Sequence, residues 1–190
     1  MKKILYVNAC VKRDTDSRTN RLAQAYLKKS LAAQECSLST VILEETSMAP
    51  LSGAALAERE KAIAANDFSG SSFELARSLV SADEVVIAAP YWDMSFPASL
   101  KLYVEQICVN KLTFCYNEKG MPCGLTNIKK VVYVTTSGGF IGNNNFGFEY
   151  IKALFTALFG VKEIIFFSAE GLDICGSDPE KILSEAIEKM

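Results

Sequence analysis

An apolar, β-branched run at residues 84–89 stops at Pro90 and passes directly into an aromatic and polar loop. Strands that are apolar without alternation are typical of a parallel sheet buried on both faces. In an open α/β sheet, the loops after the carboxyl ends of the strands form the ligand crevice. The stretch therefore predicts a buried strand that delivers aromatic side chains to the edge of a crevice.

Four further β-branched runs alternate with helical patterns along the chain. The expected strands are residues 3–8, 39–43, 84–89, 130–136 and 163–168. The first expected helix has an N-cap at Ser17 and an apolar stripe formed by Leu22, Ala23, Tyr26, Leu27 and Leu31. A second helix is expected over residues 54–65, and a third ends near Val80. The fourth begins at Pro97 and has an apolar face of Leu100, Tyr103, Val104 and Ile107. A fifth helix ends at Leu158, and a last one starts at Asp178. Residues 112–116 and 120–124 predict a small hairpin.

This alternation of strands and helices predicts an α/β fold with a doubly wound, five-stranded parallel sheet between two helical layers. Five such strands fit the flavodoxin-like order 2-1-3-4-5, whose switch point lies between strands one and three. A length of 190 residues predicts a single domain over residues 1–190.

Composition and charge narrow the classes of partner. The formal net charge is −2 and no basic run exceeds two residues, which argues against a nucleic-acid partner. The short apolar run after Lys3 ends at Asn8, too early for a secretory signal or a membrane span. We therefore expect no membrane association and a cytoplasmic location.

The chain has six cysteines and no histidine. No C-x-x-C pair is present, so we expect no metal site. Cys115 and Cys123 are expected to face each other across the hairpin, as free thiols in a reducing cytosol. Without histidine, Ser-His-Asp and Cys-His catalysis are excluded. Any reaction must rely on a cofactor or on carboxylates, Tyr or Lys.

The loop after the first strand, residues 9–20, predicts a phosphate site. Ser17 and Thr19 supply hydroxyl groups and Arg18 a cation at the start of a helix, where unpaired N–H groups and the helix dipole favour anions. The alternative is a capped helix with a solvent-facing Arg18. Neither G-x-G-x-x-G nor a P-loop motif occurs, which favours a mononucleotide phosphate over a diphosphate.

The loops after the third and fourth strands would share this crevice. Residues 91–94 combine aromatic and thioether side chains that suit stacking on a flat ring, with a core-facing aromatic cluster as the alternative. Residues 136–140 include two successive glycines whose N–H groups can hold negative charge, with a plain turn as the alternative. Residues 141–148, rich in Asn and Gly, are expected to be mobile and to close over a substrate.

Together these motifs, with residues 114–120 between them, resemble the FMN-dependent NADH:quinone oxidoreductase and azoreductase family over nearly the whole chain. The resemblance implies FMN as cofactor, NADH or NADPH as electron donor, a quinone or azo compound as acceptor, and a homodimer. It implies two-electron, ping-pong reduction in which the flavin carries the chemistry, so no catalytic residue is assigned.

The resemblance also implies roles for individual residues. Phosphate or ribityl contacts fall on Cys10, Ser17, Arg18 and Thr19. Contacts to the flavin ring fall on Pro90, Tyr91, Trp92, Asp93, Met94, Thr136, Ser137, Gly138 and Gly139. The substrate pocket is expected to include Tyr116 and Phe140, completed by a second subunit. Protonation of the acceptor is expected from water or from Tyr116.

Two residues depart from the family pattern. Cys10 stands where the family has Ser, which is a stronger donor. Asp93 replaces the usual Asn beside the flavin, and an ionised carboxylate there would disfavour an anionic reduced ring and lower its potential.

Two other functions fit parts of the sequence. A one-electron flavodoxin-type carrier would share the fold, but it would present an acidic face that this near-neutral chain lacks. An iron–sulfur flavoprotein would need a compact cysteine cluster, and the six cysteines are scattered.

Overall fold

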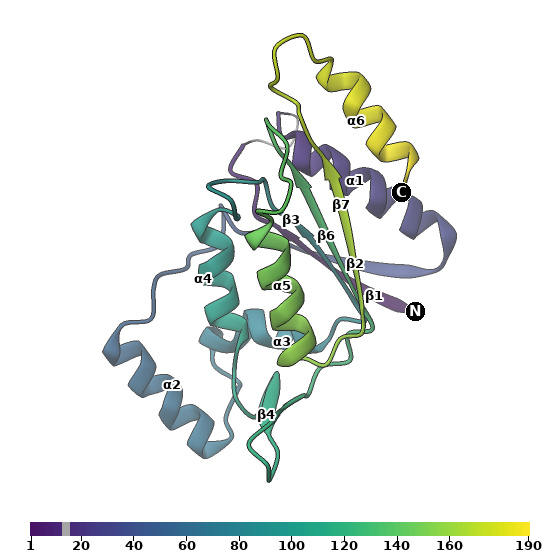
Figure 1. Cartoon of the computed structure of the whole chain (residues 1–190). Coiled ribbons are helices and arrows are strands. Elements are labelled where there is room, and N and C mark those ends of the chain that lie inside the picture. Colours follow the sequence, from purple (N-terminus) through teal and green to yellow (C-terminus); the bar gives the residue numbers. More distant parts are fainter. Residues whose placement is uncertain (13–15) are drawn as a thin grey trace.

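The computed structural model describes residues 1–12 and 16–190. Its main sheet has five parallel strands in the order β2-β1-β3-β6-β7 (Figure 1). This confirms the predicted flavodoxin-like order, because β6 and β7 are the fourth and fifth parallel strands along the chain. The strands are β1 Lys2–Asn8, β2 Cys36–Ile42, β3 Glu84–Ala88, β6 Lys130–Thr136 and β7 Glu163–Ala169.

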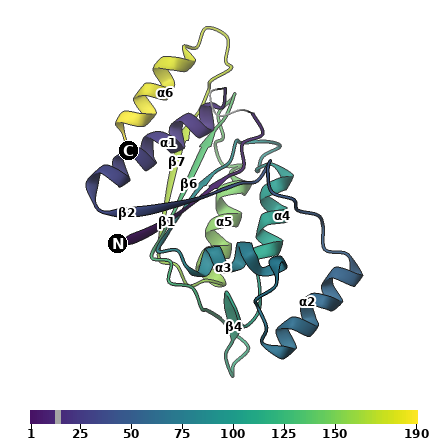
Figure 2. The same ribbon diagram turned by 180° about the vertical axis from the view of Figure 1, so that it is seen from behind.

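Helices cover both faces of the sheet, which confirms the three layers (Figures 1 and 2). One face carries α1 and α6, and the other carries α3, α4 and α5. The helices are α1 Arg18–Ala33, α3 Glu74–Val80, α4 Ala98–Ile107, α5 Phe146–Ala157 and α6 Pro179–Glu188, with a short 3-10 turn over Ser71–Phe73.

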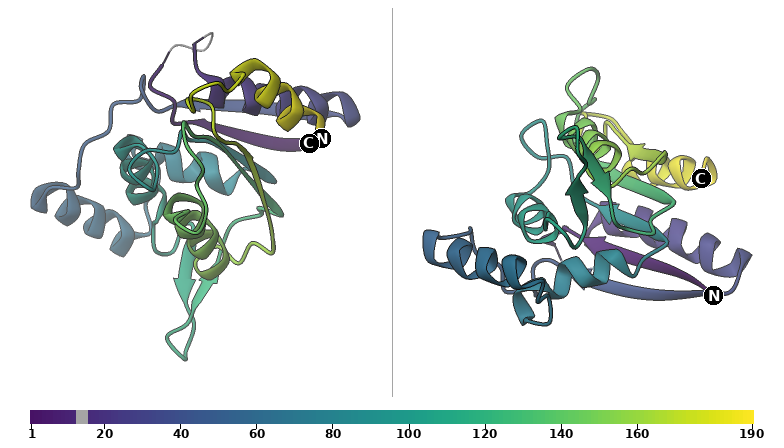
Figure 3. Two further views of the ribbon diagram at one scale, coloured as in Figure 1. Left: turned by 45° about the horizontal axis from the view of Figure 1, so that its top comes forward. Right: turned by 90° about the horizontal axis from the view of Figure 1, so that it is seen from below.

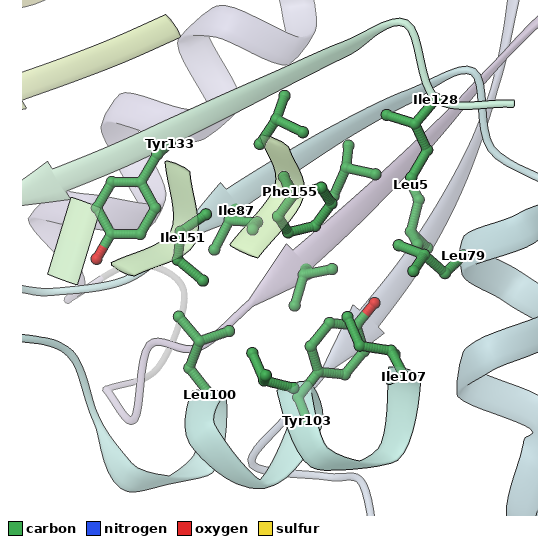
Figure 4. Close-up of a cluster of buried hydrophobic side chains, with 14 of the residues drawn as sticks. Leu5, Leu79, Ile87, Leu100, Tyr103, Ile107, Ile128, Tyr133, Ile151 and Phe155 are labelled. Atoms are coloured by element: carbon green, nitrogen blue, oxygen red, sulfur yellow. The ribbon is translucent and has the colours of Figure 1, made fainter. Parts of the chain in front are cut away.

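The central strands are apolar because both of their faces are buried. In β3, Val85 and Ile87 pack against the α3–α4–α5 layer, whereas Val86 packs against the α1–α6 layer. Figure 4 shows the first of these cores, to which α4 contributes Leu100, Tyr103 and Ile107 and β1 contributes Leu5. Two-sided burial explains the unbroken runs of Val and Ile in the sequence.

Two elements lie outside this sandwich. Helix α2, Gly53–Ala65, has no buried residue and stands away from the sheet (Figure 3). The strands β4 Phe114–Tyr116 and β5 Pro122–Gly124 form the predicted antiparallel hairpin, with Cys115 opposite Cys123. Gly124 is required there, since a Cβ would lie 2.1 Å from the carbonyl oxygen of Phe159.

Some sequence-based boundaries need correction. Strand β2 begins at Cys36 rather than at residue 39, and Pro97 is the N-cap of α4 rather than part of its first turn. Leu31 does not join the apolar stripe of α1, because it is 38% exposed near the end of that helix. Within the described residues, no helix has both the length and the apolar content needed to cross a bilayer.

Candidate functional site

A cleft of about 260 Å³ lies at the carboxyl ends of β1, β3 and β6. Four segments line it: the loop into α1, the loop after β3, the loop after β6, and the loop after β7. It therefore lies at the predicted switch point, next to the reversal of strand order between β1 and β3. The lining residues are Cys10, Val11, Lys12, Asp16, Ser17, Arg18, Thr19, Pro90, Tyr91, Trp92, Thr136, Ser137, Gly138, Leu172 and Asp173.

The start of α1 provides hydrogen-bond donors to the cleft. Ser17 is the N-cap, as predicted, and its hydroxyl oxygen accepts the N–H of Asn20 at 3.2 Å. The N–H groups of Arg18 and Thr19 have no acceptor among the described residues. The first turn also contains no acidic side chain. These are the conditions under which a helix start binds an anion.

Buried polar contacts hold α1 in place against the sheet. The Oδ1 atom of Asn20 accepts the hydroxyl of Tyr6 and lies 3.5 Å from Nδ2 of Asn8. The hydroxyls of Thr19 and Thr136 are 2.6 Å apart, which joins α1 to the end of β6. Sequence analysis missed Asn20 as a supporting residue. Its signal was a polar residue on the buried face of an amphipathic helix, one turn before Ala23.

The loop after β3 contains a tight two-residue turn at Asp93 and Met94. Trp92 and Ser95 exchange backbone hydrogen bonds of 3.2 and 2.7 Å, and the two central residues have φ values of 50° and 65°. Positive φ at both positions defines a type I′ turn, which non-glycine residues adopt at a cost. The N–H groups of Asp93 and Met94 have no acceptor among the described residues.

This turn presents its side chains to solvent rather than to the core. Trp92 is 46% exposed and Met94 is also exposed, which contradicts the alternative of a core-facing cluster. Tyr91 is anchored by its N–H to the carbonyl of Thr136 at 3.0 Å and by its hydroxyl to the carbonyl of Asn144 at 2.9 Å. Exposed large apolar side chains around a cleft indicate a binding surface.

The loop after β6 is fixed by the neighbouring loop after β7. Backbone N–H groups of Leu172 and Asp173 donate to the carbonyls of Ser137 and Gly138, at 3.2 and 2.9 Å. A Cβ on Gly138 would lie 2.5 Å from Oδ2 of Asp173. The missing side chain of Gly138 thus makes room for Asp173. The N–H groups of Gly138 and Gly139 have no acceptor among the described residues.

Charged groups around the cleft are balanced. The guanidinium of Arg18 donates to the carbonyl of Leu172 at 3.3 Å and to the Asp173 carboxylate at 2.8 Å. Lys12 and Asp16 also line the cleft. Arg18 is therefore part of the cleft wall, which contradicts the alternative of a solvent-facing side chain. Asp173 escaped sequence analysis because nothing in the sequence marks the loop after the last strand.

The structure brings most, but not all, of the expected site residues into the cleft. The lining leaves out Asp93, Met94 and Gly139, which follow or adjoin lining residues in the chain. Phe140 is highly exposed beside Gly171. Tyr116 lies on the hairpin, at the far end of the sheet (Figure 1), where it lines a second cleft of about 670 Å³ with α2 and α4. Residues 13–15 of the first loop lie outside the described residues.

Of the six cysteines, Cys10 is the one in the lining of the cleft. All six are free, and no group of three or more metal-ligating side chains occurs among the described residues. Cys10 is buried, with its Sγ 3.9 Å from the carbonyl oxygen of Ala88. Burial raises the pKa of the Cys108 thiol to about 11, so this thiol is protonated near neutral pH.

Comparison with known proteins agrees with the fold described above. A sequence family described as having a Flavodoxin-like fold matches residues 2–190. An FMN-dependent NADH:quinone oxidoreductase of Clostridium perfringens (strain ATCC 13124) is 31% identical over 194 residues, spanning 100% of this chain and 96% of that protein. A protein of the same name from Lachnoclostridium phytofermentans is 33% identical over 195 residues, with the same coverage.

Solved structures share the fold. The azoreductase from Bacillus anthracis strain Sterne has a TM-score of 0.84 at 20% identity, covering 100% of this chain and 96% of that one. The FMN-dependent NADH-azoreductase from B. anthracis strain Ames Ancestor, solved in complex with FMN, has a TM-score of 0.83 at 23% identity, covering 100% and 95%.

The contribution of the Ser17 N-cap to stability can be tested against that of a second serine N-cap. Ser17 caps α1 and Ser52 caps α2, each accepting an N–H at 3.2 Å. We expect Ser17→Ala to lower the free energy of unfolding by about 1 kcal/mol, because α1 is packed on the sheet. Ser52→Ala should change it by less, since α2 buries no residue. Urea denaturation of both variants measures the free energy of unfolding. Equal losses in the two variants would contradict the stronger packing of α1.

Proposed function

Because the chain belongs to the flavodoxin-like family that includes the FMN-dependent NADH:quinone oxidoreductases, we propose that it is an FMN-dependent NAD(P)H oxidoreductase that reduces quinones or azo compounds. One observation carries the proposal beyond relatedness: three loops from neighbouring strands converge on one cleft that has free N–H donors at one end and an exposed aromatic turn at the other.

The residues present in the cleft fit FMN. The N–H groups of Arg18 and Thr19, which have no acceptor within residues 1–12 and 16–190, and the hydroxyl of Ser17 are suitable ligands for its phosphate. Trp92 offers an exposed aromatic surface for the ring. Gly138 lines the cleft, and Asp93, Met94 and Gly139 follow or adjoin lining residues. Their N–H groups have no acceptor among the described residues and are donors for the polar edge of the ring. These assignments are part of the proposal.

In the mechanism, FMN supplies the redox chemistry when bound, by accepting a hydride from NAD(P)H and returning two electrons to the acceptor. The chain's own residues bind and orient. The start of α1 would hold the phosphate, and the turn at Asp93 and Met94 would contact the ring. The N–H groups of Gly138 and Gly139, which have no acceptor among the described residues, would stabilise negative charge on the ring. With no histidine in the chain, the acceptor takes its protons from water or from Tyr116.

Rapid mixing tests this function. The FMN-loaded protein should bleach when mixed anaerobically with NADH or NADPH, and the colour should return when a quinone or an azo dye is added. Protein-free FMN at the same concentration is the control for direct reduction. A loaded protein that does not bleach with either nucleotide would instead be a one-electron carrier of the flavodoxin type.

We further propose a homodimer in which the hairpin of one subunit completes the cleft of the other. The support is geometric: Tyr116 is exposed and lies away from its own cleft, so it reaches a substrate only across a subunit boundary. Sedimentation equilibrium should give twice the chain mass. Tyr116→Ala should then raise the KM for the acceptor several-fold while leaving FMN affinity unchanged. A monomer with full activity would exclude this arrangement.

We also propose a cytoplasmic location. Six free cysteines, including a cross-strand pair, are typical of a reducing compartment. Cell fractionation tests this, and recovery from an oxidising compartment would contradict it.

Asp93 provides a test of how the turn tunes the cofactor. Asn tolerates the positive φ of this position as well as Asp does, so Asp93→Asn removes only the charge. The repulsion between the exposed carboxylate and an anionic reduced ring is about 0.5–1 kcal/mol. Its loss should raise the two-electron midpoint potential of bound FMN by roughly 10–20 mV. Spectroelectrochemical titration measures the shift. An unchanged potential would show that only the backbone of Asp93 faces the ring, and a lower potential would contradict the proposed repulsion.

A further inference from the structure

Asp173 occupies a position that joins three parts of the cleft. It lies in the loop after β7, and its backbone N–H donates to the carbonyl of Gly138 at 2.9 Å. Its carboxylate accepts from the Arg18 guanidinium at 2.8 Å. The same carboxylate packs so closely on Gly138 that a Cβ there would lie 2.5 Å from Oδ2. One side chain thus contacts both the start of α1 and the loop after β6.

The guanidinium of Arg18 is held at two points, both from the loop after β7. Nη1 donates to the carbonyl of Leu172 at 3.3 Å and Nη2 donates to Asp173. A guanidinium carries five N–H donors, so further donors remain for a ligand. An arginine that is already ordered loses less side-chain freedom when it binds an anion than one that moves freely.

The loop that carries these two acceptors is itself anchored. Backbone N–H groups of Gly171, Leu172 and Asp173 donate to the carbonyls of Gly139, Ser137 and Gly138, at distances of 3.1, 3.2 and 2.9 Å. Asp173 therefore has a fixed backbone from which to direct Arg18. The Arg18 side chain is 32% exposed and lines the cleft beside the free N–H groups at the start of α1.

We propose that Asp173 is a positioning residue for phosphate recognition: it orders the Arg18 guanidinium at the phosphate end of the cleft and so makes the protein prefer the phosphorylated flavin, FMN, over riboflavin. The inference rests on the proposed function, since it concerns the same cleft. The Asp173 carboxylate is paired with Arg18, and Lys12 and Asp16 contribute opposite charges to the lining. The attraction for phosphate therefore comes mainly from the helix N–H groups and the remaining guanidinium donors.

The test compares FMN with riboflavin, which lacks only the phosphate, by quenching of flavin fluorescence. Asp173→Ala should weaken FMN binding by roughly five- to tenfold, the size expected for losing one charge-assisted hydrogen bond. Riboflavin binding should change by less than about twofold, since the backbone hydrogen bonds that hold the Gly138 loop do not involve the Asp173 side chain. Asp173→Asn keeps an oxygen that accepts from Nη2, so it should restore FMN affinity to the wild-type value or better.

A matched control lies on the same helix. Arg21 pairs with Glu180 at 2.6 Å, and the Glu180 side chain is 68% exposed, against 66% for Asp173. Glu180 does not line the cleft. Glu180→Ala therefore removes an equivalent exposed partner of an α1 arginine, and it should leave the affinities for both flavins unchanged.

A double-mutant cycle shows whether Asp173 acts through Arg18. Arg18→Ala should lose the preference for FMN, and adding Asp173→Ala should then change it no further. Should Asp173→Ala fail to fold, Asp173→Leu, which keeps the branched shape without an acceptor, takes its place. Additive losses in the cycle would contradict a route through Arg18.

The outcomes separate the inference from the function on which it rests. If the wild-type protein binds neither FMN nor riboflavin, the proposed function is wrong and the inference falls with it. If the wild-type protein binds FMN but Asp173→Ala keeps the ratio of the two affinities, only the inference is overturned. Tighter FMN binding in Asp173→Ala would also overturn it, because Asp173 would then compete with the phosphate.

Discussion

The reversal of strand order at β1 is the constraint on which the site depends. Strand β1 pairs with β2 on one side and with β3 on the other. The chain leaves β1 for α1 on one face of the sheet and leaves β3 for α4 on the opposite face. Because the two connections diverge, they leave a crevice between them. Any sequence that keeps this order gains a cleft there, and the loop residues decide what it binds.

The two ends of the sheet use polar groups in opposite ways. At the amino end of β3, the fully buried carboxylate of Glu84 accepts the hydroxyl of Tyr26 at 2.8 Å and pairs with Lys2 at 2.6 Å. The hydrogen bond from Tyr26 fixes α1 on the sheet, and Lys2 supplies the opposite charge to the buried carboxylate. At the carboxyl end, the N–H groups of Arg18, Thr19, Gly138 and Gly139 have no acceptor among the described residues. Polar groups that the fold leaves unpaired in a cleft are available to a ligand.

Sequence patterns predicted the fold well because its strongest signals are local. Two-sided burial produces unbroken apolar strands, and Ser17 and Asp178 mark helix starts through their own side chains. The prediction that Leu31 belongs to the apolar stripe of α1 was wrong, because periodicity does not show where the sheet beneath α1 ends. Asn20 and Asp173 were missed because their partners lie far away in the chain or in a loop without a pattern. Whether Tyr116 serves the cleft depends on a second subunit, which remains a prediction.

The absence of histidine gives these geometric details their importance. In an enzyme whose cofactor carries the electrons, the protein contributes mainly position and electrostatics. Both come here from the backbone: a helix start, a type I′ turn and a pair of glycines. Backbone donors cannot be titrated or replaced, so differences among related chains must arise from the few side chains that orient or oppose them. Asp173 beside Arg18 is such a side chain, and we propose the same role for Asp93. Both are carboxylates, so we expect these two side chains to act on the cleft through charge.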